Sequence, residues 1–237
     1  WTATHTPATV QAKHLRTIEF GMGDGTNTSD VEIPACFLKE LEIIGAPGQP
    51  IRFRASGSGR RIQSSTRTGA LALPAIQEVP FALSKVYIDS TWANLGTTQI
   101  TGQIIGWRWK LSTGLKEQQT ADARADQDFT VIVLDPDELK WTLEIDMKAN
   151  LNTGQWQTEK TAAEALTLRA VRVQADITGV EADQLRLDGL FKHTAGSLFP
   201  VGRQDGEVTA TLSLEGSTDD TNTFAMVAQN GVTAAIT

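Results

Sequence analysis

The sequence is poor in the residues on which most catalytic and metal sites depend. It has one cysteine, Cys36, and its three histidines, His5, His14 and His193, show no metal-ligand or triad spacing. A single cysteine excludes an intrachain disulfide and a zinc site of the Cys-x-x-Cys type. The Gly-x-Ser-x-Gly motif of a serine nucleophile is also missing. We therefore expect a protein that is not an enzyme and has no catalytic residues, no metal site and no cofactor.

Long apolar runs and a positive net charge are absent as well. No run approaches the ~20 residues that a helix needs to span a bilayer, so we expect no association with a membrane. The formal net charge is −7. An acidic chain is disfavoured as a general nucleic-acid binder, because such binding depends on basic residues that contact phosphates.

Charge is divided unevenly along the chain. Residues 1–117 carry 12 Lys/Arg against 9 Asp/Glu, whereas residues 118–237 carry 9 against 19. A basic half and an acidic half would suit head-to-tail self-association. The alternative is a chance clustering of charges on a solvated surface.

The strongest positive signal is a two-residue alternation of apolar and polar side chains. In residues 139–147, the apolar side chains fall on one face of an extended strand: Leu139, Trp141, Leu143, Ile145 and Met147. The alternation recurs in segments 104–112, 170–177, 184–191 and 207–215, and weaker strand candidates are 37–44, 51–55, 81–88 and 128–134. Half-buried alternation is typical of antiparallel sheets. We predict an all-β fold of two packed antiparallel sheets, as a sandwich or flattened barrel.

Other segments complete the predicted organisation. Residues 158–168 are rich in helix formers and predict one flanking α-helix. The polar stretch 56–75 predicts a long loop. The weakly patterned ends, 1–33 and 216–237, predict terminal arms that become ordered on assembly, which leaves 34–215 as the β-domain.

Residues 81–114 carry the motifs of a family resemblance. A segment with Tyr87-Ile88-Asp89 is followed by the turn Leu95-Gly96-Thr97-Thr98-Gln99 and by a strand that ends in Ser112-Thr113-Gly114. These motifs resemble a segment of siphophage tail tube proteins, the major subunits of long non-contractile tails. The similarity extends over about residues 38–228, and it lies in the order of strands, turns and the one helix.

The resemblance implies a structural role and no enzymatic one. Subunits of this family form hexameric rings that stack into a hollow tube, and strands of all subunits join around a lumen that is typically acidic. DNA passes through the lumen without specific binding. The expected partners are further copies of the chain and the tape measure, tail terminator and tail tip proteins. The expected location is the phage tail of the virion, and the host cytoplasm during assembly.

Two groups of charged residues are candidates for such a tube. Glu144 and Asp146 project from the polar face of the 139–147 strand, and we predict that they face the lumen, the alternative being outside water. Segment 51–67 has five arginines and no acid. We predict that this basic segment contacts acidic residues of the next ring. Its arginines are Arg52, Arg54, Arg60, Arg61 and Arg67.

Two further interpretations stay open. The inner tube of a contractile tail or injection system shares the same architecture as the siphophage tube. A β-sandwich adhesin or carbohydrate-binding module would be monomeric and would expose its tryptophans. Trp107 and Trp109 fall on the apolar side of their strand, which favours packing in the core.

Overall fold

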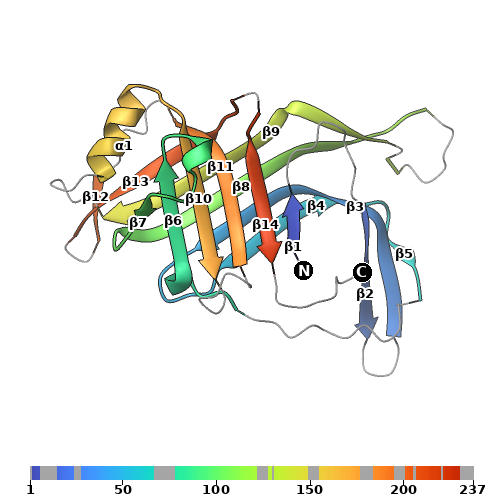
Figure 1. Cartoon of the computed structure of the whole chain (residues 1–237). Coiled ribbons are helices and arrows are strands. Elements are labelled where there is room, and N and C mark those ends of the chain that lie inside the picture. Colours follow the sequence, from blue (N-terminus) through green and yellow to red (C-terminus); the bar gives the residue numbers. More distant parts are fainter. Residues whose placement is uncertain are drawn as a thin grey trace.

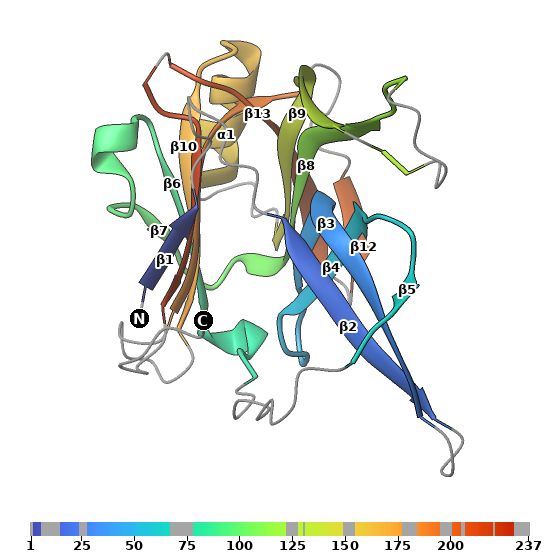
Figure 2. The same cartoon turned by 90° about the vertical axis from the view of Figure 1, so that its right-hand side faces the viewer.

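The chain folds into one antiparallel sheet that curls over itself (Figures 1 and 2). The structure is a computed structural model. It describes residues 2–5, 15–23, 28–66, 78–121, 128–129, 131–148, 155–176, 184–194, 201–204, 207–219 and 221–229.

Fourteen strands and one α-helix occur in these described ranges. The strands are β1 (Thr2–His5), β2 (Arg16–Gly23), β3 (Thr28–Gly45), β4 (Arg52–Ser58), β5 (Gln63–Ser64), β6 (Ser84–Asp89), β7 (Gln99–Ile100), β8 (Ile104–Gln118), β9 (Val131–Lys148), β10 (Arg169–Asp176), β11 (Gln184–His193), β12 (Val201–Gln204), β13 (Glu207–Gly216) and β14 (Phe224–Gln229). The helix α1 spans Gln155–Glu164, and short 3-10 turns lie at Phe81–Leu83 and Trp92–Asn94.

The sheet makes two layers, which Figure 2 shows side by side. Layer one contains β4, β3, β8, β9, β13 and β12, with β2 and β5 along the first part of β3. Layer two contains β7, β6, β10, β11, β14 and β1. The layers join where the end of β11 pairs with β13. On the other side, the Ile51 amide donates to the Val79 carbonyl at 2.8 Å, so the curl is nearly closed.

Apolar side chains from both layers fill the space between them. Layer one contributes the rings of Trp107, Trp109 and Trp141. The Trp141 Nε1–H crosses the core and donates to the Leu190 carbonyl at 3.2 Å. Such a bond offsets the cost of burying the polar atom of a large apolar ring, whereas the buried Nε1 atoms of Trp107 and Trp109 have no hydrogen-bond partner among the described residues. The predicted core position of Trp107 and Trp109 is confirmed.

Helix α1 covers one end of this core. Its Ala162 and Ala163 pack inward, and the helix ends before Leu166, which adopts a positive φ of 52°. A left-handed residue cannot continue a right-handed helix. The helix therefore ends before the predicted Leu168. It also begins earlier than predicted, at Gln155 instead of Thr158.

The β8–β9 hairpin bends where it leaves the core. The register shifts between Thr113 and Leu115, and Gly114 between them has a φ of +67°. A side chain on Gly114 would meet the Asp135 carbonyl at 2.3 Å. Only glycine suits this bulge, because it tolerates both the positive φ and the close backbone.

The structure confirms the all-β fold with one helix and corrects other expectations. The two predicted sheets are two layers of one sheet. The two predicted terminal arms contain strands. The segment 1–33 holds β1, β2 and the start of β3, and β14 within 216–237 pairs with β11. The predicted loop 56–75 holds the end of β4 and all of β5, while 67–77 lie outside the described residues. Sequence reasoning took the two ends for terminal arms and 56–75 for a loop, because apolar and polar residues alternate only weakly in these segments.

Candidate functional site

A three-stranded extension projects from the two layers, and we call it the arm. It consists of β2, residues 28–36 of β3, and β5 (Figures 1 and 2). In its register, Ile18 lies opposite Ile33 and Phe20 lies opposite Val31, so these four apolar side chains share one face. Ile18 is 52% exposed, although it is a large apolar residue. The arm thus presents apolar surface outside the core.

The other face of the arm is acidic. Glu19 lies opposite Glu32, and Asp30 follows on the same face. Glu32 accepts hydrogen bonds from the Gln63 side chain and from the Ser65 hydroxyl, the latter at 3.1 Å. These bonds tie β5 to β3, so the arm is an amphipathic ribbon with one apolar and one acidic face.

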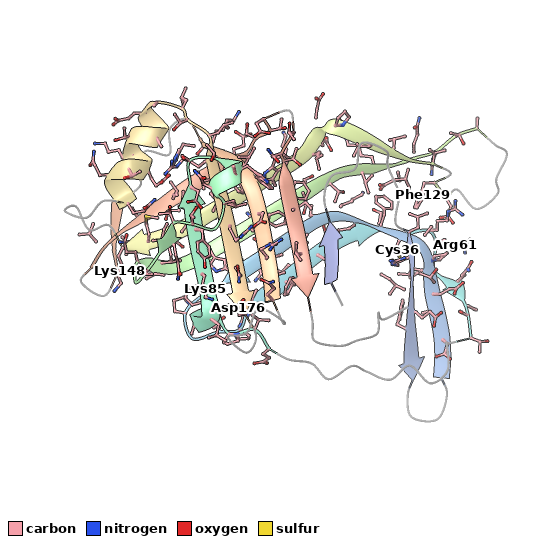
Figure 3. The ribbon with its side chains drawn as sticks, in the orientation of Figure 1. Cys36, Arg61, Lys85, Phe129, Lys148 and Asp176 are labelled. Carbon is pink, nitrogen blue, oxygen red and sulfur yellow. The ribbon has the colours of Figure 1, made fainter. Side chains whose placement is uncertain are left out.

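A small second core fixes the base of the arm. Phe37, Phe129 and Ile132 are buried together there. The rings of Phe37 and Phe129 meet edge to face with centroids 5.8 Å apart. The nearby Cys36 thiol donates to the Ile33 carbonyl at 3.1 Å (Figure 3). This packing holds the arm at its base.

Strand β4 is an edge of layer one. Among the described residues it pairs with β3 alone. Phe53 lies opposite Ile43 on the core side, yet it is 55% exposed. Arg52 and Arg54 lie on the other side of the strand and are exposed as well. An edge strand with free backbone groups and an exposed aromatic ring is a docking site for another strand.

The structure places four of the five candidate arginines, and they fall into two groups. Arg52 and Arg54 lie on β4, whereas Arg60 and Arg61 lie beside the base of the arm (Figure 3). The Arg60 guanidinium lies 5.6 Å from the Phe129 ring centroid, and the Arg61 amide donates to the Asp128 carboxylate at 2.9 Å. Arg67 lies outside the described residues. The Arg61 side chain is exposed, and its role in contacts between rings stays a prediction.

Glu144 and Asp146 lie on the outer surface of layer one, which we call the polar face. They share this face with basic residues of β4, β8 and β9: Arg52, Arg54, Arg108, Lys110 and Lys140. Glu40 and Glu42 of β3 belong to it too. A hollow of about 450 Å³ lies over its middle, lined by Glu40, Glu42, Arg54, Lys110 and Lys140 among others. The polar face is therefore of mixed charge.

Ion pairs link the strands across the polar face. The Arg108 Nε lies 3.4 Å from the Glu42 carboxylate, and the Arg108 Nη1 lies 3.3 Å from that of Glu144. Opposite charges on adjacent strands contribute modestly to pairing. Asp146 accepts a hydrogen bond from the Thr211 hydroxyl.

Sequence reasoning missed the arm and the ion pairs that Glu42 makes with neighbouring strands. The arm had a signal, because Ile18 and Phe20 alternate with Thr17 and Glu19. The glycines at 21, 23 and 25 masked it by suggesting a loop. The ion pairs of Glu42 had no such signal in the sequence, because they depend on which strands lie beside β3.

Neither a model of a known protein family nor a curated protein matches the chain. Within the described ranges, no group of three or more His, Cys, Asp or Glu residues could hold a metal ion. In the same part of the chain, no helix has the length and apolar character to cross a membrane.

Proposed function

We propose that the chain is the structural subunit of a phage tail tube, assembled as stacked hexameric rings around a passage for DNA. The ring number and the stacking come from the resemblance to siphophage tail tube proteins. The observation that carries the proposal is that one subunit presents, among its described residues, two different strand edges, β2 and β4, whose apolar and charged residues suit each other.

The complementarity extends to both faces of the strands. If β2 of one subunit pairs with β4 of the next, Ile18 and Phe20 can lie beside Phe53 on one face. Glu19 then lies beside Arg52 or Arg54 on the other face. Burying the apolar residues removes exposed surface from water, and the opposite charges fix the orientation. Since the two edges differ, the contact is head to tail, and it forms a ring where the rotation between successive subunits closes.

The arm needs such a partner on physical grounds. The longest part of the arm is the β2–β3 hairpin, and a hairpin of two strands is marginal in water unless it packs against another element. Joining edges around a ring also removes open strands, which otherwise promote irregular aggregation. In this assembly the polar face of layer one lines the passage, and it carries Glu144 and Asp146.

Negative-stain electron microscopy of the purified chain tests the proposal. We expect rings or tubes with a central hole. A chain that stays monomeric at every protein concentration, salt concentration and pH would contradict the tube. That result would favour a β-sandwich adhesin or carbohydrate-binding module. A contractile tail has a sheath protein that assembles on its inner tube. Adding such a sheath protein to the tubes therefore distinguishes the two kinds of tail.

A further inference from the structure

The polar face contains a dense group of cations in the middle of layer one. Arg54, Lys110 and Arg108 come from β4 and β8, the two strands that flank β3. Neighbouring strands lie about 4.8 Å apart, so these charges crowd together. Their side chains are 69%, 50% and 45% exposed, which leaves them within reach of a large polyanion.

One carboxylate lies at the centre of all three cations. Glu42 on β3 is directly opposite Arg54 on one side and Lys110 on the other. Its oxygens lie 3.5 Å from Arg54, 3.8 Å from Lys110 and 3.4 Å from Arg108. The Glu42 side chain is only 20% exposed, so it lies beneath the cations that it contacts. Glu144 holds Arg108 from the other side at 3.3 Å.

We infer that Glu42 keeps the polar face from binding DNA by pairing with these three cations. Binding of DNA gains free energy when cations contact phosphates and release the counterions of the DNA. A cation already paired with a carboxylate must give up that partner first. The wall therefore avoids adhesion by pairing its charges, which differs from the excess of acid that the family resemblance implies. Its relevance to DNA passage rests on the proposed function.

A comparison of two neighbouring carboxylates tests the inference. Glu42→Gln removes the negative charge beneath the cations and keeps the side-chain shape. Glu40→Gln is the matched control, because it removes the same charge from the same face of β3. The Glu40 carboxylate accepts a hydrogen bond from the Ser56 hydroxyl at 3.3 Å instead of pairing with these cations. Fluorescence anisotropy of a short labelled DNA duplex measures binding at low and at physiological salt.

We expect Glu42→Gln to bind DNA about tenfold or more tighter than the wild type and Glu40→Gln. Binding should weaken steeply with salt, with a log–log slope of about −2 to −3 for two to three phosphate contacts. Adding Arg108→Gln to Glu42→Gln should abolish most of the gain. Circular dichroism of each variant verifies that the fold is kept.

Two results would overturn the inference: equal gains in Glu40→Gln and Glu42→Gln, or no gain in either. The assay needs no tube, because it measures binding by the chain in any assembly state. Electron microscopy of the same samples tests the proposed function separately. A gain in Glu42→Gln without tubes would support the inference about charge pairing and contradict the tube.

Discussion

At the scale of single residues, the buried carboxylate of Glu159 is held by several partners at once. It is 0% exposed and lies on the inner side of α1. The Arg169 Nε donates to it at 3.0 Å, a second bond comes from the same guanidinium, and the His193 Nε2 lies 3.4 Å away. Gln155 donates to it at 2.8 Å. This cluster connects the helix to the ends of β10 and β11.

Removing Glu159 should destabilise the protein strongly. Glu159→Ala leaves the buried Arg169 guanidinium without its carboxylate, and loss of one member of a buried ion pair costs about 3–5 kcal/mol. Glu164→Ala is the matched control on the same helix, since its exposed pair with Lys160 at 3.9 Å contributes about 0.5 kcal/mol at most. Urea unfolding at neutral pH measures both. Similar effects of the two substitutions would contradict the assigned role of Glu159.

The same carboxylate predicts a dependence of stability on pH. Burial acts to raise the pKa of Glu159, but hydrogen bonds from His193 and Arg169 outweigh it and lower this pKa below the ordinary 4.5. A pKa that is lower in the folded state gives stability that is present above the unfolded pKa and is lost as pH falls through the folded one. The unfolding free energy of the wild type should therefore fall below about pH 4.5, and Glu159→Ala should lose part of this slope. A slope that is unchanged in Glu159→Ala, measured by urea unfolding across acidic pH, would disagree.

At the scale of elements, the proposed contact between copies of the chain rests on the arm and β4. The arm is an amphipathic ribbon fixed at its base by Phe37 and Phe129. Strand β4 is an edge with an exposed ring at Phe53. Neither feature is needed to complete the main core, which lies between the two layers.

A charge on the apolar face of the arm should block assembly and spare the fold. Ile18→Asp places a carboxylate where the proposed contact buries an apolar side chain, and an unpaired buried charge is costly. Thr17→Asp adds the same charge to the other face of β2. We expect Ile18→Asp to stay monomeric in sedimentation velocity, while Thr17→Asp assembles like the wild type. Assembly of Ile18→Asp into normal tubes would exclude the arm from the contact.

At the scale of the whole molecule, the fold places the β2 and β4 edges in different parts of the molecule. One curled sheet carries an acidic, apolar β2 edge on its arm and a basic, aromatic β4 edge on its body. A head-to-tail contact between such edges repeats in one direction and can close on itself. The strands of a ring would then continue from one subunit to the next.

A reciprocal exchange of charge tests this contact within one chain. Glu19→Arg and Arg52→Glu should each weaken assembly, because each places like charges opposite one another in the proposed pair of strands. The double variant Glu19→Arg/Arg52→Glu restores opposite charges in reversed order. We expect it to recover rings in electron micrographs, at a yield well above either single variant. Failure of the double variant to exceed the single ones would exclude this pair.

The sequence by itself determined the strands of the core, the all-β class and the burial of Trp107 and Trp109. Alternation between Trp141, Leu143 and Ile145 and their polar neighbours is a local property, because successive side chains of any strand point to opposite faces. The Thr158–Leu168 composition likewise indicated the helix, although its limits depend on Glu159, Arg169 and the positive φ of Leu166.

Only the tertiary structure decided which residues meet across strands. The pairing of β3 with β4 and β8 places Glu42 among Arg54, Arg108 and Lys110, which lie 12, 66 and 68 positions away in the chain. The same pairing makes β4 an edge and leaves Phe53 exposed. Register between distant strands depends on the packing of the whole core, and no local pattern around Glu42 or Phe53 contains that information.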